Sequence, residues 1–100
     1  MELKQDELRY FFEDDGELIG EIDFTYVNDH TISINHTVVD PAYRGQGLAM
    51  QLLDKVIQFS RENDLKIIPI CPFAKRKIKE DPELHDVLTP EYLENLEKEN

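Results

Sequence analysis

Hydrophobic and polar residues alternate along most of the first forty positions, which is the pattern of half-buried β-strands. The alternation predicts strands over residues 8–13, 18–26 and 32–38, separated by turn signals at residues 14–16 and 28–30. Three strands joined by short turns are expected to form an antiparallel meander. The predicted apolar faces hold Leu8, Tyr10 and Phe12, then Leu18, Gly20, Ile22, Phe24 and Tyr26, then Ile32, Ile34, His36 and Val38.

After residue 47 the apolar positions recur every three or four residues, which predicts an amphipathic helix over residues 47–62. Residues 66–70 are almost wholly apolar and predict a short strand covered on both faces, with one side left unpaired near Pro69. A short helix is expected after Cys71, and Thr89-Pro90 predicts the start of a last helix. The strand-helix-strand crossover makes the third and fourth strands parallel neighbours, in an α/β fold.

Length and composition indicate a globular protein. The chain has 100 residues, so residues 1–100 are expected to form one compact domain. Hydrophobic residues make up 40% of it and charged residues 33%, which disfavours disorder. No apolar run reaches the ~18 residues of a membrane span, and the first residues lack the features of a signal peptide, so a cytoplasmic location is expected. The single cysteine forms no internal disulfide, and no metal-ligand set is recognisable, so no metal is expected.

The charge distribution narrows the partners. Acidic residues number 22 and basic residues 11, for a net charge of -11, so neither nucleic acid nor an anionic membrane is expected to bind. Basic residues gather in the middle of the chain, at Arg44 and then at Lys75, Arg76, Lys77 and Lys79, where an anionic ligand is expected. A solvated helix face is the alternative explanation of the second group.

Residues 40–49, Asp-Pro-Ala-Tyr-Arg-Gly-Gln-Gly-Leu-Ala, join the third strand to the long helix. Gly45 and Gly47 have no side chains, so an anion can approach the backbone, and the first helical turn directs free N–H groups at it. Arg44 adds a cation. The segment is a candidate phosphate-binding loop; an ordinary helix start that uses glycine for a tight turn is the alternative.

The run Arg44-Gly45-Gln46-Gly47-Leu48-Ala49, which follows a strand ending in Val-Asp-Pro, resembles the acyl-CoA loop of the Gcn5-related N-acetyltransferases, Gln/Arg-x-x-Gly-x-Gly/Ala. It is neither a Walker loop nor a Rossmann fingerprint. The resemblance implies the acyl-CoA N-acyltransferase fold, with an antiparallel three-strand meander, a helix, a parallel strand and short C-terminal helices. It also implies that N–H groups of Gly45 to Ala49 hold the CoA pyrophosphate, and that Val38 and Val39 bond the pantetheine arm through their backbone. Pro69 fits, because in this family the two parallel strands splay apart around the cofactor.

Further segments are similar to the compact YjdJ-like, or N-acetyltransferase domain-containing, subfamily over about residues 8–88: His36-Thr37, the loop, residues 69–73 and Asp81-Pro82-Glu83. Cys71 ends the cleft strand and is a candidate nucleophile, with a buried structural cysteine as the alternative. His36 is a candidate base for Cys71 or for an amine, with a packed, hydrogen-bonded histidine as the alternative. Cys71 and Phe73 complete the expected cofactor-binding set. The chain departs from the family pattern in having Lys77 where an aromatic residue is expected, Asp81 where a histidine is expected, and no tyrosine between residues 43 and 92 to protonate the leaving thiolate.

Two functions from different classes remain open at this point. The first is an enzyme that transfers an acetyl group from acetyl-CoA to an amine acceptor, either a small polyamine-like molecule or a basic protein tail, acting as a monomer or weak homodimer. The second is a non-catalytic acyl-CoA-binding sensor or adaptor. A small interaction domain without a cofactor requires the loop match to be accidental.

Overall fold

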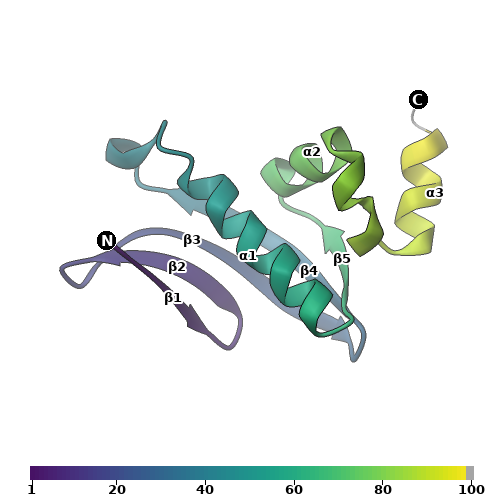
Figure 1. The fold of residues 1–100 in the computed structure, drawn as a ribbon, viewed down its shortest axis with the longest axis horizontal. Helices are drawn as coiled ribbons and strands as arrows, with labels where there is room; N and C mark the ends of the chain where they lie inside the picture. The colour runs from purple at the N-terminus through teal and green to yellow at the C-terminus, as the bar shows by residue number, and fades with distance from the viewer. Residues whose placement is uncertain (99–100) are drawn as a thin grey trace.

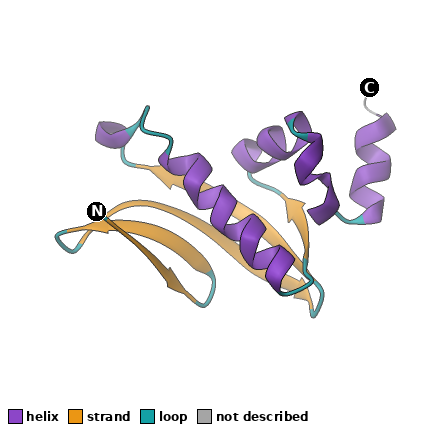
Figure 2. Ribbon diagram, in the orientation of Figure 1, coloured by secondary structure: helices purple, strands orange, loops and turns teal. Residues whose placement is uncertain are grey.

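The computed structural model describes residues 1–98, which form a five-stranded mixed sheet with helices packed against it (Figure 1). The strands lie in the order β1-β2-β3-β4-β5, antiparallel from β1 to β4 and parallel between β4 and β5. Figure 2 shows the alternation of these strands and helices along the chain. The elements are β1 (Glu2–Asp6), β2 (Arg9–Asp14), β3 (Glu17–Asn28), β4 (Thr31–Val39), the 3-10 turn η1 (Pro41–Tyr43), α1 (Leu48–Glu62), β5 (Lys66–Pro69), α2 (Pro72–Glu80), the 3-10 helix η2 (Pro82–Val87) and α3 (Pro90–Lys98). The predicted meander, crossover helix and parallel strand are therefore confirmed.

Strand β1 is an addition to the prediction. All five of its residues, Glu-Leu-Lys-Gln-Asp, are exposed, so it has no apolar face that a hydrophobic pattern could reveal. It is defined by backbone pairing with β2, and Lys4 Nζ bonds Glu13 across that pair at 2.7 Å. Leu8, which the pattern placed in a strand, lies in the turn between β1 and β2 and is 42% exposed.

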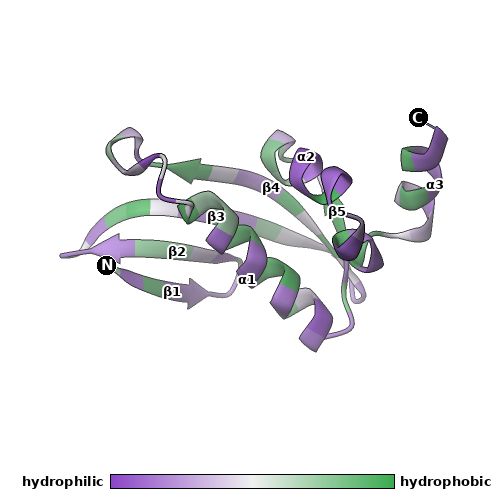
Figure 3. Cartoon of the chain, turned by 45° about the horizontal axis from the view of Figure 1, so that its top comes forward, coloured by the Kyte–Doolittle hydropathy of each residue, from purple (hydrophilic) through white to green (hydrophobic). Residues whose placement is uncertain are grey.

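The core lies between the sheet and α1. Helix α1 begins at Leu48, one residue inside the predicted range, and buries a stripe that includes Leu52, Leu53 and Val56 against β2, β3 and β4. Each such side chain contributes roughly 1.5–3 kcal/mol when fully buried. Figure 3 shows the apolar and polar bands that alternate along α1, as expected of a helix with one buried face. Of the helices within residues 1–98, none has the length and apolar character required to cross a membrane.

A β-bulge at the β2–β3 pair changes which residues of β3 face the core. The register shifts between Phe12 and Glu13, because Ile19 is an extra residue on β3. A bulge reverses the alternation of side chains beyond it. Ile19 is therefore buried, whereas Leu18, expected on the apolar face, is 46% exposed.

A second bulge, at Asn35 of β4, has a larger consequence. The β3–β4 register shifts between Asp23 and Phe24, so the alternation also reverses after Asn35. Beyond this point Thr37 and Val39 are half-buried, and Val39 packs against the core. His36 and Val38 are exposed on the opposite face. Their predicted place on the apolar face of this strand was wrong.

The helices leave one face of the β3–β4–β5 region uncovered. On β5, Ile67 and Pro69 are buried toward the helices, but Ile70, just beyond the strand, is 59% exposed. The expectation that both faces of this strand are covered was therefore wrong. We call the face that carries His36, Val38 and Ile70 the uncovered face; no helix of residues 1–98 buries these three side chains.

Candidate functional site

The parallel strands β4 and β5 separate halfway along β4. Their pairing matches Thr31–Ile34 with Lys66–Pro69 and then stops. The two N–H groups that follow Pro69 both donate to the Ile34 oxygen, at 2.9 and 3.0 Å. The chain then turns into α2, so residues 35–39 of β4 keep one edge without a neighbouring strand.

Alternate residues present their backbone groups at this free edge. The Val38 oxygen is turned toward β3, since it lies 3.1 Å from the position that a Cβ on Gly20 would occupy. The Asp40 N–H also donates to β3, at 2.7 Å. Successive residues of a strand direct their backbone groups to opposite sides. Thr37 and Val39, rather than Val38, therefore direct theirs to the free edge.

The loop before α1 has the backbone of an anion-binding turn. Gly45 and Gly47 have φ values of +85° and +74°, in the left-handed region that residues other than glycine adopt only at a cost in free energy. Gly47 is the N-cap of α1, makes no side-chain capping bond, and is followed by no acidic residue in the first turn. The N–H groups and positive dipole end of a fifteen-residue helix thus lack compensation by a side chain.

Two cations adjoin this helix end without a carboxylate partner. Arg44 is exposed at the start of the loop, and Lys77 is half-buried on α2. Neither forms an ion pair with another residue between positions 1 and 98, whereas Lys4, Arg9 and Arg61 all do. In a chain with twice as many acidic as basic residues, this leaves a local excess of positive charge.

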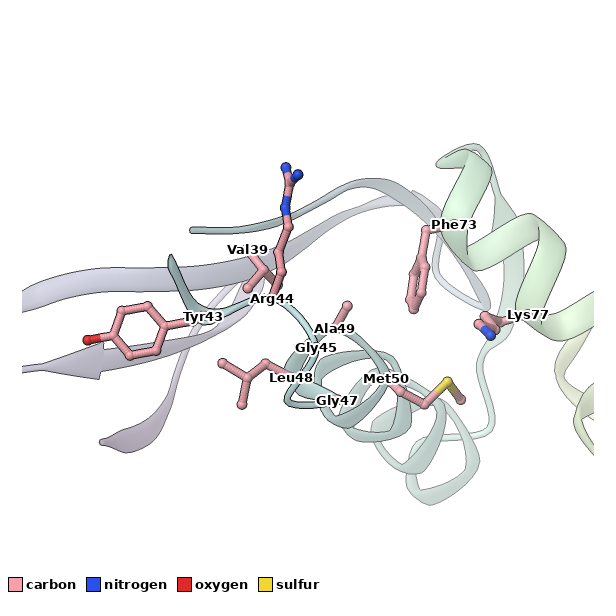
Figure 4. Close-up of a pocket in the computed structure, with 10 residues that line it drawn as sticks. All are labelled: Val39, Tyr43, Arg44, Gly45, Gly47, Leu48, Ala49, Met50, Phe73 and Lys77. Carbon is pink, nitrogen blue, oxygen red and sulfur yellow. The ribbon is translucent and has the colours of Figure 1, made fainter. Parts of the chain in front are cut away.

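A cavity of about 280 Å³ lies between the loop, the end of β4 and α2 (Figure 4). Phe73 and Lys77 face Ala49 and Met50 across it in this view, and Arg44 extends from the loop on the other side. Of the residues predicted to bind a cofactor, those that line the cavity are Val39, Arg44, Gly45, Gly47, Leu48, Ala49 and Phe73. Val38, Gln46 and Cys71 do not line it. The cavity joins an apolar wall to a polar, cationic loop.

Three further lining residues, Tyr43, Met50 and Lys77, were outside the predicted cofactor-binding set, although Tyr43 belongs to the candidate loop and Lys77 to the basic group where an anionic ligand was expected. Tyr43 directly precedes Arg44 and closes η1, so its position beside the loop was a usable signal. Lys77 lies four residues after Phe73, which places both on one face of a helix. That spacing could have identified Lys77 once Phe73 was assigned to the site.

Cys71 lies where β4 and β5 separate, as the N-cap residue of α2. It is 4% exposed, and its thiol donates to Thr37 Oγ1 at 3.3 Å. Because Thr37 and His36 are consecutive on β4, their side chains point to opposite faces of the sheet. The structure therefore does not bring His36 to Cys71, and the hydrogen-bond partner of the His36 ring is Asp23 on β3.

Comparisons with known proteins agree on one family. Residues 9–87 match GCN5-related N-acetyl-transferases. The chain is similar to Protein NATD1 of Homo sapiens, with 35% identity over 74 residues, which are 74% of this chain and 60% of that protein. The match thus spans less than two thirds of the length of that relative. Among solved structures it is similar to a GCN5-like protein from Staphylococcus aureus, with 36% identity, a TM-score of 0.74 and coverage of 88% of this chain and 87% of that one. It is also similar to the GNAT family N-acetyltransferase YhbS from Escherichia coli in complex with CoA, with 26% identity, a TM-score of 0.55 and coverage of 61% and 38%.

Proposed function

We propose, on the premise that this chain belongs to the GCN5-related N-acetyltransferase family, that it transfers an acetyl group from acetyl-CoA to an amine. One observation carries the proposal. A helix N-terminus without a side-chain cap, a glycine turn and Arg44, which forms no ion pair within residues 1–98, meet in one cavity beside the free edge of β4. This combination suits a ligand that has a phosphate group at one end and a peptide-like arm at the other.

In this proposal the pyrophosphate binds to the N–H groups of residues 45–49, with Arg44 beside it. The pantetheine arm has amide groups of its own, which pair with Thr37 and Val39 at the free edge as a strand would. Phe73 supplies an apolar wall on the α2 side. The relative YhbS, which has CoA bound, supports this choice of ligand.

We favour direct transfer from the thioester to the amine over an acetyl-cysteine intermediate. The Cys71 thiol donates to the Thr37 hydroxyl, and no basic side chain of the described residues bonds its sulfur. A cysteine nucleophile is usually paired with an adjacent general base that takes its proton, and Cys71 bonds a hydroxyl instead. Cys71→Ala is therefore expected to keep turnover. Loss of turnover with unchanged CoA affinity would instead assign the acyl transfer to the thiol.

A non-catalytic acyl-CoA-binding module is the second candidate. It is favoured by the uncovered face, where no helix of residues 1–98 encloses an acceptor beside β4. It is also favoured by the absence of a tyrosine between residues 43 and 92 that could protonate the leaving thiolate. The net charge of -11 favours a cationic acceptor such as a polyamine or a basic protein tail, if turnover occurs. Acetylation of spermidine would decide for the enzyme; tight CoA binding without acetylation of any amine would decide for the module.

The test of the binding site is a thermal unfolding experiment with and without acetyl-CoA. A ligand at about a hundredfold over its Kd stabilises the folded state by roughly 2.7 kcal/mol, which raises the Tm of a chain this size by roughly 10 °C or more. Arg44→Glu is expected to weaken CoA binding about tenfold or more, because a charged hydrogen bond contributes roughly 1.5–3 kcal/mol. Lys55→Glu is the matched control, since Lys55 is an exposed cation on α1 outside the cavity. Equal affinity in both variants, or no rise in Tm for the wild type, would refute the site.

A further inference from the structure

The pair of Asp23 on β3 and His36 on β4 has chemistry that the cofactor cavity does not use. The two residues are direct cross-strand partners on the uncovered face. Asp23 Oδ1 accepts the backbone N–H of His36 at 3.0 Å, and His36 Nδ1 lies 3.2 Å from Oδ1 and 3.3 Å from Oδ2. An ionised carboxylate has no proton to donate, so in the neutral ring the proton of this bond belongs to Nδ1, and Nε2 then has a free lone pair. The His36 side chain is 75% exposed, so Nε2 is accessible from solvent.

His36 lies on the strand that has the free edge, β4, and Asp23 lies one strand further into the sheet, on β3. Pairing with β5 ends at Ile34, two residues before His36. Thr37, the next residue, directs its side chain to the helix face and its backbone to the free edge. A thioester lying along this edge would have one side closed by Cys71 and α2 and the other side open, where the His36 ring stands.

The surroundings of the pair are negatively charged. Arg9 is opposite Asp23 in the β2–β3 register, but its guanidinium bonds Asp6 and Glu21, each at 2.6 Å. Two carboxylates thus share the arginine, and Asp23, which does not bond it, remains available to His36. Such a surface attracts a protonated amine and repels an anionic acceptor.

We propose that the acceptor, a cationic primary amine, enters from the uncovered face and is deprotonated by His36 Nε2, with Asp23 as the positioning residue that fixes the ring tautomer. The inference rests on the proposed acetyl transfer and deepens it. It assigns the acceptor side of the reaction to a face opposite to that of α1 and α2.

The protons and bonds balance as follows. The ammonium group gives one proton to Nε2, and the exposed imidazolium passes it to solvent. The free amine attacks the thioester carbon, a C–N bond forms, and the C–S bond breaks with its electron pair going to sulfur. The second proton of the amine ends on the CoA thiolate, so the products are the acetylated amine and CoA thiol.

Asp23→Asn is the decisive variant. The new amide oxygen can still accept the His36 backbone N–H, so strand pairing is retained. The amide has no negative charge and places its NH₂ at the Oδ2 position, which lies 3.3 Å from Nδ1 in the wild type, so it no longer holds the ring proton on Nδ1 and weakens Nε2 as a base. Nitrogen-detected NMR of the His36 ring is expected to show the Nδ1–H form in the wild type and a larger fraction of the Nε2–H form in the variant. An Nε2–H wild type would overturn the inference.

Kinetics give the second readout, with acetyl-CoA and spermidine as the probe. Asp23→Asn and His36→Ala are each expected to lower kcat by ~10² or more, the usual contribution of a general base, with CoA affinity by calorimetry unchanged. Added imidazole is expected to restore part of the rate in His36→Ala, because the site is open to solvent. Asp29→Asn, which removes the same charge in the turn after β3, is the control and is expected to keep the wild-type rate. Rates for Asp23→Asn equal to this control would overturn the inference while leaving the acetyltransferase proposal intact.

A different result would show that the proposed acetyl transfer itself does not occur. If the wild type binds acetyl-CoA but acetylates no amine, the acetyltransferase proposal fails, and the acceptor site is judged by NMR titration with spermidine. Shifts centred on Asp23 and His36 that are lost in Asp23→Asn would support an amine-binding face. Shifts elsewhere, or none, would overturn it.

Discussion

The left-handed conformation of Gly47 gives a prediction whose size can be worked out from the structure. Gly47 has φ +74°, and a Cβ built there would have no atom within 4 Å. Gly47→Ala therefore adds backbone strain of about 1–2 kcal/mol without any steric contact. The strain can appear in only two measurable quantities, the free energy of unfolding and the free energy of CoA binding.

Two limits bound the result. If the loop keeps its conformation, the free energy of unfolding falls by the whole strain, which lowers the Tm by roughly 4–16 °C, and CoA affinity is unchanged. If the loop relaxes in the free protein, stability recovers, but CoA must restore the left-handed turn, and its affinity falls by up to roughly 5–30-fold. In either case the losses of stability and affinity add up to about 1–2 kcal/mol.

The assays are urea unfolding without ligand and calorimetry with CoA, on matched variants. Gly16 has φ +77° in the β2–β3 turn and is equally open, so Gly16→Ala is expected to lose stability but no CoA affinity. Gly47→Asn is expected to lose less of both, because asparagine tolerates this region. A summed loss near zero in Gly47→Ala would refute the strain argument. An equal loss of affinity in Gly16→Ala would refute the placement of the loop at the ligand.

Two further predictions concern the segment that joins α1 to the C-terminal helices. Ser60 is fully buried, and its Oγ donates to the backbone oxygen of Leu65 at 2.6 Å. Ser60→Ala is therefore expected to lower the free energy of unfolding by about 1–3 kcal/mol, measured by urea unfolding with Ser60→Cys for comparison. An unchanged midpoint would show that the Leu65 oxygen finds another donor. The Arg61 guanidinium bonds the Asp86 carboxylate and holds the pKa of Asp86 below its ordinary value of 3.8. This pair therefore stabilises the fold above about pH 4, and its contribution is lost as the pH falls through the pKa of Asp86 in the folded protein. Because both side chains are about half exposed, Asp86→Asn is expected to cost under ~1 kcal/mol at pH 7 and nothing at the lowest pH; a cost that is constant with pH would contradict the ion pair.

The sequence pattern correctly predicted those features of the fold that depend only on residues close to one another in the chain. The 3.6-residue period predicted α1, and Thr89 was expected to cap the last helix, where its Oγ1 indeed accepts the Tyr92 N–H at 3.1 Å. The glycines of the loop predicted a close backbone turn before α1, and both adopt positive φ values there. Each of these features is decided within one helical turn or one loop.

The hydrophobic pattern of the sequence predicted neither strand β1 nor the uncovered face. The residues of β1 are polar and exposed on both sides, and only the neighbouring backbone of β2 makes them a strand. Ile68 and Ile70 were predicted to be buried because they are apolar. Whether a second layer covers them depends on the face of the sheet against which α2 packs after Cys71. The cation Lys77 joined the cavity for the same reason, since α2 brings it to face Met50 of α1.

The sequence by itself determined the order of elements from β2 onward, the crossover and the glycine turn before α1, because propensities, periodicity and glycine conformations act locally. The tertiary structure decided which face each side chain occupies. One extra residue at Asn35 reverses the alternation of β4, so Thr37 faces Cys71 and His36 faces Asp23. A bulge is set by the pairing of two strands, and the hydrophobic pattern of one strand does not contain it.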